Sequence, residues 1–176
     1  MNKYKIIFLD IDGVLNSDKF YRRRGEPDFK FEDEPPYPLS EFDPESVGLL
    51  NKIINETNAS IVVSSSWRIG RSMDELEELF NSVGIEGEII GKTPSYLPRS
   101  KYGETVRGDE IKLWFSIFEG SFNTENFKNK GTVNYVILDD DNDMLPEQRD
   151  NFFRTNFMLG LTEEIKESCI KFLNKD

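Results

Sequence analysis

Two carboxylates near the start of the chain have a spacing suited to paired nucleophile and acid chemistry. Asp10 and Asp12 follow the mostly apolar residues 4–9, and Gly13 comes directly after them. Side chains two residues apart in an extended chain point to the same side, so both carboxylates can face one crevice, and glycine allows a sharp turn beyond them. We predict that Asp10 attacks phosphorus to form an aspartyl-phosphate, while Asp12 serves as general acid and then as base for water.

A second acidic run supplies candidate metal ligands. Residues 139–143 read Asp-Asp-Asp-Asn-Asp and follow the apolar residues 133–138. A dianionic phosphate can approach a carboxylate only when the repulsion is offset, and Mg²⁺ is a hard cation that prefers oxygen ligands. We therefore predict a Mg²⁺ site formed by Asp10, the main-chain carbonyl of Asp12, and either Asp139 or Asp140.

A calcium loop is the alternative interpretation of the second run. Asp139, Asp141 and Asp143 alternate as they do in an EF-hand loop. Met144 stands where that loop requires glycine, however, and the residues before the run predict a strand rather than a helix. The pattern therefore favours the magnesium site.

A serine run and an arginine complete the set of groups that a bound phosphate needs. Ser64 or Ser65, after the predicted buried strand at 60–63, supplies a hydroxyl for one phosphate oxygen, and Arg107 supplies a fixed positive charge for another. The remaining predicted substrate-binding residues are Gly13, Ser66 and Arg68. Trp67 lies in the same run, and we interpret it as a core residue.

Apolar runs alternate with amphipathic stretches along the chain, which predicts an α/β fold with a doubly wound, Rossmann-like parallel sheet. Strands are expected at 4–9, 60–63, 88–90, 133–138 and 152–154. Helices are expected from Pro44 to 56, from 73 to 83, from Gly108 or Asp109 onward, and from Thr162 onward, with Asp43 and Ser72 as caps. We expect residues 4–9 to be the central strand and the site to lie at the carboxyl ends of the strands.

Residues 16–41 show no clear hydrophobic period. They include Arg22, Arg23 and Arg24, followed by an acidic, proline-rich passage at 32–36. We interpret this interval as a flap and a long surface loop, inserted into a single domain that spans residues 1–176. The three arginines are interpreted as a solvated cluster.

Composition limits the classes of function. The net charge of -11 argues against duplex DNA binding or an electrostatic grip on an anionic membrane, so any contact with a nucleic acid must be local. The chain has no histidine, and Cys169 is its one cysteine, so carboxylates must carry the acid, base and metal chemistry. We find no membrane span and no signal-peptide pattern, and we expect a cytoplasmic protein.

With these residues in this order, the chain resembles the haloacid dehalogenase superfamily over nearly its whole length. Residues 8–15, Phe-Leu-Asp-Ile-Asp-Gly-Val-Leu, look like motif I of that superfamily, and the serine run looks like motif II. Arg107 with Gly108 looks like motif III, and residues 138–140 look like motif IV. The resemblance implies a phosphatase fold with a minimal cap or none, and Mg²⁺ as the cofactor.

Two positions stay open within this resemblance. Motif II of the superfamily has one serine or threonine after the strand, and the spacing to Trp67 favours Ser65 slightly over Ser64. Motif III is more often lysine, so Lys101 and Lys112 are alternatives to the arginine.

Residues 63–68, residues 107–111, the acidic run at 139–143 and residues 160–162 look most like the phosphatase-type domains attached to bacterial RNA repair proteins, with polynucleotide kinase-phosphatases as more distant relatives. This narrower resemblance implies a phosphomonoesterase that acts on a nucleic-acid terminal phosphate or another bulky substrate. The alternatives are a phosphatase for a small nucleotide or sugar phosphate and a non-catalytic binding module that keeps the fold. The oligomeric state stays open.

Overall fold

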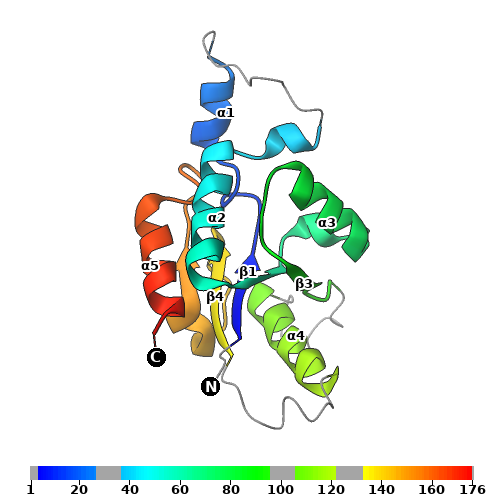
Figure 1. Ribbon diagram of the computed structural model, residues 1–176. Coiled ribbons are helices and arrows are strands. Elements are labelled where there is room, and N and C mark those ends of the chain that lie inside the picture. Colours follow the sequence, from blue (N-terminus) through cyan, green and yellow to red (C-terminus); the bar gives the residue numbers. More distant parts are fainter. Residues whose placement is uncertain (1–3, 27–36, 96–105, 122–132, 176) are drawn as a thin grey trace.

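A five-stranded parallel sheet forms the centre of the protein (Figure 1). The computed structural model describes residues 4–26, 37–95, 106–121 and 133–175. The strands are β1 (Lys5–Leu9), β2 (Ser60–Val63), β3 (Ile89–Lys92), β4 (Asn134–Asp139) and β5 (Phe152–Arg154). Their order in the sheet is β3-β2-β1-β4-β5. The predicted parallel sheet, with the first strand at its centre, is confirmed.

Helices connect these strands throughout the described residues. The α-helices are α1 (Asp18–Arg24), α2 (Pro44–Thr57), α3 (Met73–Ser82), α4 (Arg107–Ser121) and α5 (Glu163–Leu173). The 3₁₀ helices are η1 (Leu39–Glu41), η2 (Ser66–Arg68) and η3 (Pro146–Asn151). Among these helices, none combines the length and the apolar character that a membrane span requires.

β1 is buried on both faces, and its alternating side chains enter two separate apolar clusters. Ile7 and Leu9 join the larger cluster, to which α2, α3 and α5 contribute. Ile6 and Phe8 join the smaller cluster, which is covered by α4. Figure 1 shows α2 and α5 side by side. The sheet is therefore covered by helices on both faces, as an apolar parallel sheet requires.

The helix starts that the sequence predicts are formed by local hydrogen bonds. Asp43 accepts the Glu45 N–H at 3.0 Å at the start of α2. Ser72 and Glu75 form a reciprocal capping box at the start of α3. Thr162 caps α5. Because the partners lie within three residues of each other, such caps can be read directly from sequence.

The structure corrects the prediction for residues 16–41, because part of this interval is the helix α1. Ser17 caps it, and Phe20 is its one buried residue. The N–H groups of Asp18 and Lys19 donate to main-chain carbonyls of Phe157 and Met158, at 2.9 and 3.0 Å. A seven-residue helix with one buried side chain has no readable period, and its stabilising contacts come from a remote turn. Residues 27–36 lie outside the described part.

Docking of α4 on the sheet can be tested with two isoleucines of that helix. Ile111 is fully buried, whereas Ile117 is 52% exposed. We expect Ile111→Ala to lower the free energy of unfolding by about 2–5 kcal/mol, because it removes apolar contacts and leaves a cavity. Ile117→Ala is the matched control and should change it by less than about 0.5 kcal/mol. Urea denaturation followed by circular dichroism measures both, and equal losses would contradict the observed packing.

Candidate active site

The site lies where the order of the strands reverses. The chain runs outward from β1 through β2 to β3 and then returns to the other side of β1 with β4. The register pairs Leu9 with Leu138 and with Val63, so the next residue, Asp10, lies between Asp139 and Ser64 at the carboxyl edge. Asp10 N–H donates to the Leu138 carbonyl at 3.0 Å. Such a switch point is the usual ligand site of an open parallel sheet.

Three carboxylates converge at this edge. Oxygen atoms of Asp10, Asp139 and Asp140 lie within 4.8 Å of one another. Asp139 is fully buried, and its Oδ2 has no hydrogen-bond partner among the described residues. Asp141, which the calcium-loop alternative needs, is exposed and lies outside this group. The cluster is thus a set of oxygen donors of the kind that a hard divalent cation prefers.

Gly13 makes room for one of these carboxylates. Its φ of +71° lies in the left-handed region, and a Cβ built there would lie 2.4 Å from Cγ of Asp140. Its N–H donates to Oδ1 of Asn16 at 2.9 Å. A side chain at this position would displace Asp140, so the structure gives Gly13 a steric reason beyond the predicted turn.

Burial and mutual repulsion shift the acidities of the cluster. Burial raises the pKa of Asp10, although Arg107 and the Ser65 hydroxyl oppose the rise. The pKa of Asp139 is raised to about 7, mainly by burial and to a smaller extent by the charge of Asp10. Both effects disfavour two adjacent carboxylates that are ionised together, and a bound cation would remove that penalty.

Arg107 is the cation that the described structure brings to these carboxylates. Its Nε lies 3.3 Å from Oδ2 of Asp139, and its Nη1 donates to the Ser64 carbonyl. Burial lowers the pKa of Arg107, but the charges of Asp10 and Asp139 outweigh burial and raise it. It begins α4, one residue earlier than predicted, and its N–H donates to Asp143 Oδ2 at 2.8 Å.

The two lysines considered for the same role lie elsewhere or outside the described residues. Lys112 is exposed and pairs with Glu147 at 3.1 Å. Lys101 lies in an interval that the structure does not describe. Among the described residues, the geometry therefore favours Arg107 as the cation of the site.

Arg68 lies beneath the site rather than in its opening, and we revise its predicted role. It is 2% exposed, and its guanidinium donates to the carbonyls of Ser64 and Ser65, both at 2.7 Å, and of Thr93 at 2.8 Å. Its Nη2 donates to the Pro94 carbonyl and to Glu110 Oε2. These bonds use the donors of the guanidinium, so a substrate phosphate has none to accept from.

The same carboxylate of Glu110 joins both arginines. Its Oε2 lies 2.7 Å from Arg68 Nη2 and 3.3 Å from Arg107 Nη1. Glu110 was not singled out in the sequence, because an acidic residue in the first turn of a helix is ordinary. Through Glu110, the loop that Arg68 binds and the guanidinium of Arg107 are thus fixed relative to each other.

The three serines take different positions in the structure. The Ser65 hydroxyl lies close enough to the Asp10 carboxylate to lower its pKa, and it accepts the Trp67 N–H at 3.3 Å. The Ser64 hydroxyl is buried and has no partner among the described residues. Ser66 is exposed. The geometry therefore favours Ser65 over Ser64 as the hydroxyl next to the predicted nucleophile.

Asp12 is held by two residues whose role the sequence did not reveal. Trp67 Nε1 donates to its Oδ2 at 3.0 Å, and Asn16 Nδ2 donates to its Oδ1 at 2.9 Å. Trp67 also packs edge-on against the buried Phe42, in agreement with the core interpretation. An aromatic residue directly after the serine run was the one available signal.

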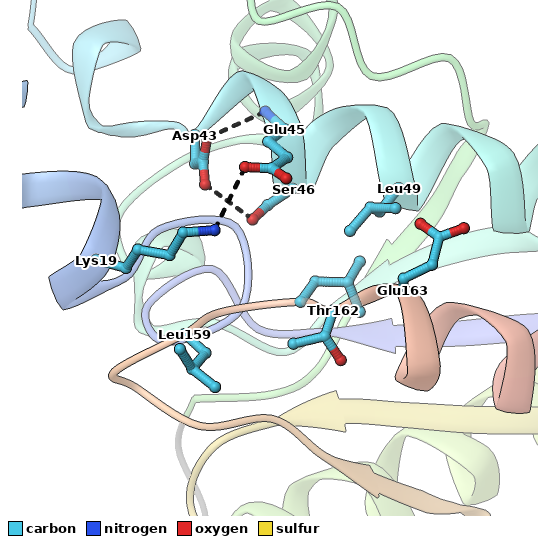
Figure 2. A pocket seen from close by; sticks show the side chains of 9 residues that line it. Lys19, Asp43, Glu45, Ser46, Leu49, Leu159, Thr162 and Glu163 are labelled. Carbon is cyan, nitrogen blue, oxygen red and sulfur yellow. Dashed lines mark hydrogen bonds and ion pairs between the residues drawn. The ribbon is translucent and has the colours of Figure 1, made fainter. Parts of the chain in front are cut away.

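A small cavity lies apart from the acidic cluster. It measures about 170 Å³ and is lined by residues of α1, the start of α2 and the start of α5 (Figure 2). Figure 2 shows Lys19 of α1 pointing to Glu45 of α2, 3.6 Å away. Both side chains are exposed, so the pair adds little stability. None of the predicted site residues lines the cavity.

The fold and this constellation define a domain of the haloacid dehalogenase class. A family profile described as "HAD domain in Swiss Army Knife RNA repair proteins" matches residues 6–165. The chain belongs to this family. Searches of curated proteins and of solved structures found no match. Membership supports a hydrolase or phosphatase of this class in general terms.

The raised pKa of Asp139 predicts a pH-dependent penalty in the metal-free protein. Between the unfolded value of 3.8 and the folded value of about 7, the folded state binds more protons, so stability falls as pH rises through this window. Asp139→Asn has no such proton to lose. In EDTA, we expect the variant to gain stability relative to the parent by more than about 1 kcal/mol between roughly pH 4 and pH 8.

Chemical denaturation at both ends of that pH range measures the difference. The exposed Asp141→Asn is the matched control and should show no such trend. A constant difference between Asp139→Asn and the parent would contradict the electrostatic account. Added Mg²⁺ should stabilise the parent and have less effect on Asp139→Asn.

Proposed function

We propose that the chain is a Mg²⁺-dependent phosphomonoesterase that acts through an aspartyl-phosphate on Asp10. The observation that carries this proposal is the convergence of Asp10 with Asp139, Arg107 and Ser65 at the switch point of the sheet. Membership in the family supports the general class of reaction.

The donor set fits Mg²⁺. Asp10, Asp139 and Asp140 offer carboxylate oxygens within reach of one ion, and Asp139 Oδ2 is buried without a hydrogen-bond partner in the described structure. The predicted ligand set also includes the main-chain carbonyl of Asp12. When bound, the ion would offset the negative charge of the carboxylates and of the incoming phosphate.

The residues have distinct tasks in the proposed reaction. The Asp10 carboxylate forms a bond to phosphorus as the bond to the leaving oxygen breaks, and Asp12 gives that oxygen a proton. Asp12 then takes a proton from water, which attacks phosphorus and breaks the bond to Asp10, releasing inorganic phosphate. Arg107 and Ser65 would hold the phosphoryl oxygens through charge-assisted and neutral hydrogen bonds.

For the substrate, we favour a terminal phosphate on a nucleic acid or another bulky molecule. The family description refers to RNA repair proteins. That description applies to those proteins, and it supports the choice of a nucleic-acid end for this chain. A net charge of -11 disfavours extended contact with a phosphate backbone. An enzyme that holds only a chain end needs few such contacts, so the charge is compatible with an end-specific activity.

Activity itself is the first test. With Mg²⁺, the purified protein should hydrolyse p-nitrophenyl phosphate, and Asp10→Asn should lower kcat by about 10³-fold or more, because the nucleophile is lost. The exposed Asp141→Asn is the control and should keep the parent's rate. An inactive parent across a broad panel of phosphate monoesters would overturn the proposal. Absence of thermal stabilisation by Mg²⁺ with beryllofluoride would then favour the binding-module alternative.

The leaving group is the second test. We expect kcat/KM for oligonucleotides with a terminal 3′- or 5′-phosphate to exceed kcat/KM for the matching mononucleotides by about 10-fold or more, since a bulky substrate gains additional contacts. RNA and DNA versions should be compared at fixed salt concentration. A preference for mononucleotides or sugar phosphates would support the small-molecule alternative instead.

A further inference from the structure

Both carboxylate oxygens of Asp12 accept a hydrogen bond from a side chain. Trp67 and Asn16 each donate to a different oxygen, at 3.0 and 2.9 Å. A carboxylate oxygen has two lone pairs, so one site on each oxygen stays available for a proton. The two donors therefore fix the plane of the carboxylate without blocking its chemistry.

The direction of the Trp67 indole is set by groups other than Asp12. Phe42 packs edge-on against it with ring centroids 5.3 Å apart. The Arg71 guanidinium lies 5.6 Å from the ring centroid, and its Nη1 donates to the Trp67 carbonyl at 2.6 Å. Ser65 Oγ accepts the Trp67 main-chain N–H. The indole N–H is thus held in place before any substrate arrives.

The Asn16 amide is oriented in a similar way. Asn16 is fully buried, and its Oδ1 accepts the Gly13 N–H at 2.9 Å. With the oxygen engaged by Gly13, the amide nitrogen faces Asp12. The turn that follows the predicted nucleophile therefore contains its own donor for the acid.

We propose that Trp67 and Asn16 are positioning residues for Asp12, which hold its carboxylate toward the leaving oxygen. This inference rests on the proposed phosphomonoesterase activity and deepens it. Trp67 belongs to the segment that also contains Ser65, the hydroxyl next to Asp10. One short segment thereby sets the geometry of the nucleophile and of the acid, which lie on opposite sides of the phosphorus in the reaction.

Loss of positioning should depend on the leaving group. An alkoxide is a poor leaving group and needs the proton from Asp12 as its bond to phosphorus breaks, whereas p-nitrophenolate leaves with little assistance. The value of kcat/KM reports the steps up to this bond cleavage. A misplaced acid should therefore lower kcat/KM more for an alkyl phosphate than for p-nitrophenyl phosphate.

The variant Trp67→Phe, which keeps an aromatic ring and removes the N–H, would test this positioning role. We expect kcat/KM for propyl phosphate to fall by roughly 10- to 100-fold and that for p-nitrophenyl phosphate by less than about 5-fold. Asn16→Ala, which removes the donor to Asp12 without adding a charge, should show the same selectivity. Trp114→Phe is the matched control, because Trp114 lies in the apolar cluster on the other face of the sheet.

A second measurement separates positioning from damage to the fold. Thermal stabilisation by Mg²⁺ with beryllofluoride should persist in Trp67→Phe, because the nucleophile and the acidic cluster are unchanged. If the parent is active and both variants lower kcat/KM equally for the two substrates, or leave both unchanged, the positioning role is wrong while the phosphatase proposal stands. A parent that is inactive on both substrates and across the broad panel of phosphate monoesters would instead overturn the phosphatase proposal.

Discussion

Repulsion between two buried carboxylates is the constraint on which the rest of the site depends. Pairing of β1 with β4 places Asp10 beside Asp139, and burial keeps water from screening their charges. The surrounding groups supply part of the compensation: Arg107 contacts Asp139, and the neighbouring Ser65 hydroxyl lowers the pKa of Asp10. If Asp10 and Asp139 are both ionised, their repulsion requires further positive charge nearby. A divalent cation would supply that charge.

The segment between β2 and α3 links the separate parts of the site. Ser65 contacts Asp10, Trp67 contacts Asp12, and Arg68 binds the main chain of the same loop from below. Through Glu110, the loop is also connected to Arg107. Buried charges cost solvation energy, and here the Arg68 guanidinium is paired with Glu110 and has all its N–H donors engaged, which favours one arrangement of the loop.

Burial of the carboxylates also bears on which substrate the proposed enzyme would accept. Asp10 and Asp139 are buried, so under the proposed function a phosphate at the end of a molecule fits this edge of the sheet better than one within a continuous backbone. α1 lies beyond the carboxyl end of β1 (Figure 1) and is tied to the remote turn that contains Phe157 and Met158. The position of α1 thus depends on contacts between segments distant in sequence.

The sequence by itself determined the α/β class, the central place of β1 in the sheet, and the positions of the main acidic residues, because strand periodicity, caps and strand-end polarity are local properties. Only the tertiary structure decided that Ser65 rather than Ser64 contacts Asp10, that Arg68 is structural, and that Trp67 donates to Asp12. These roles depend on side-chain directions across segments as far as 55 residues apart, and α1 depends on a turn more than 130 residues away. Local pattern carries no information about such contacts, because they exist only once the sheet has brought the segments together.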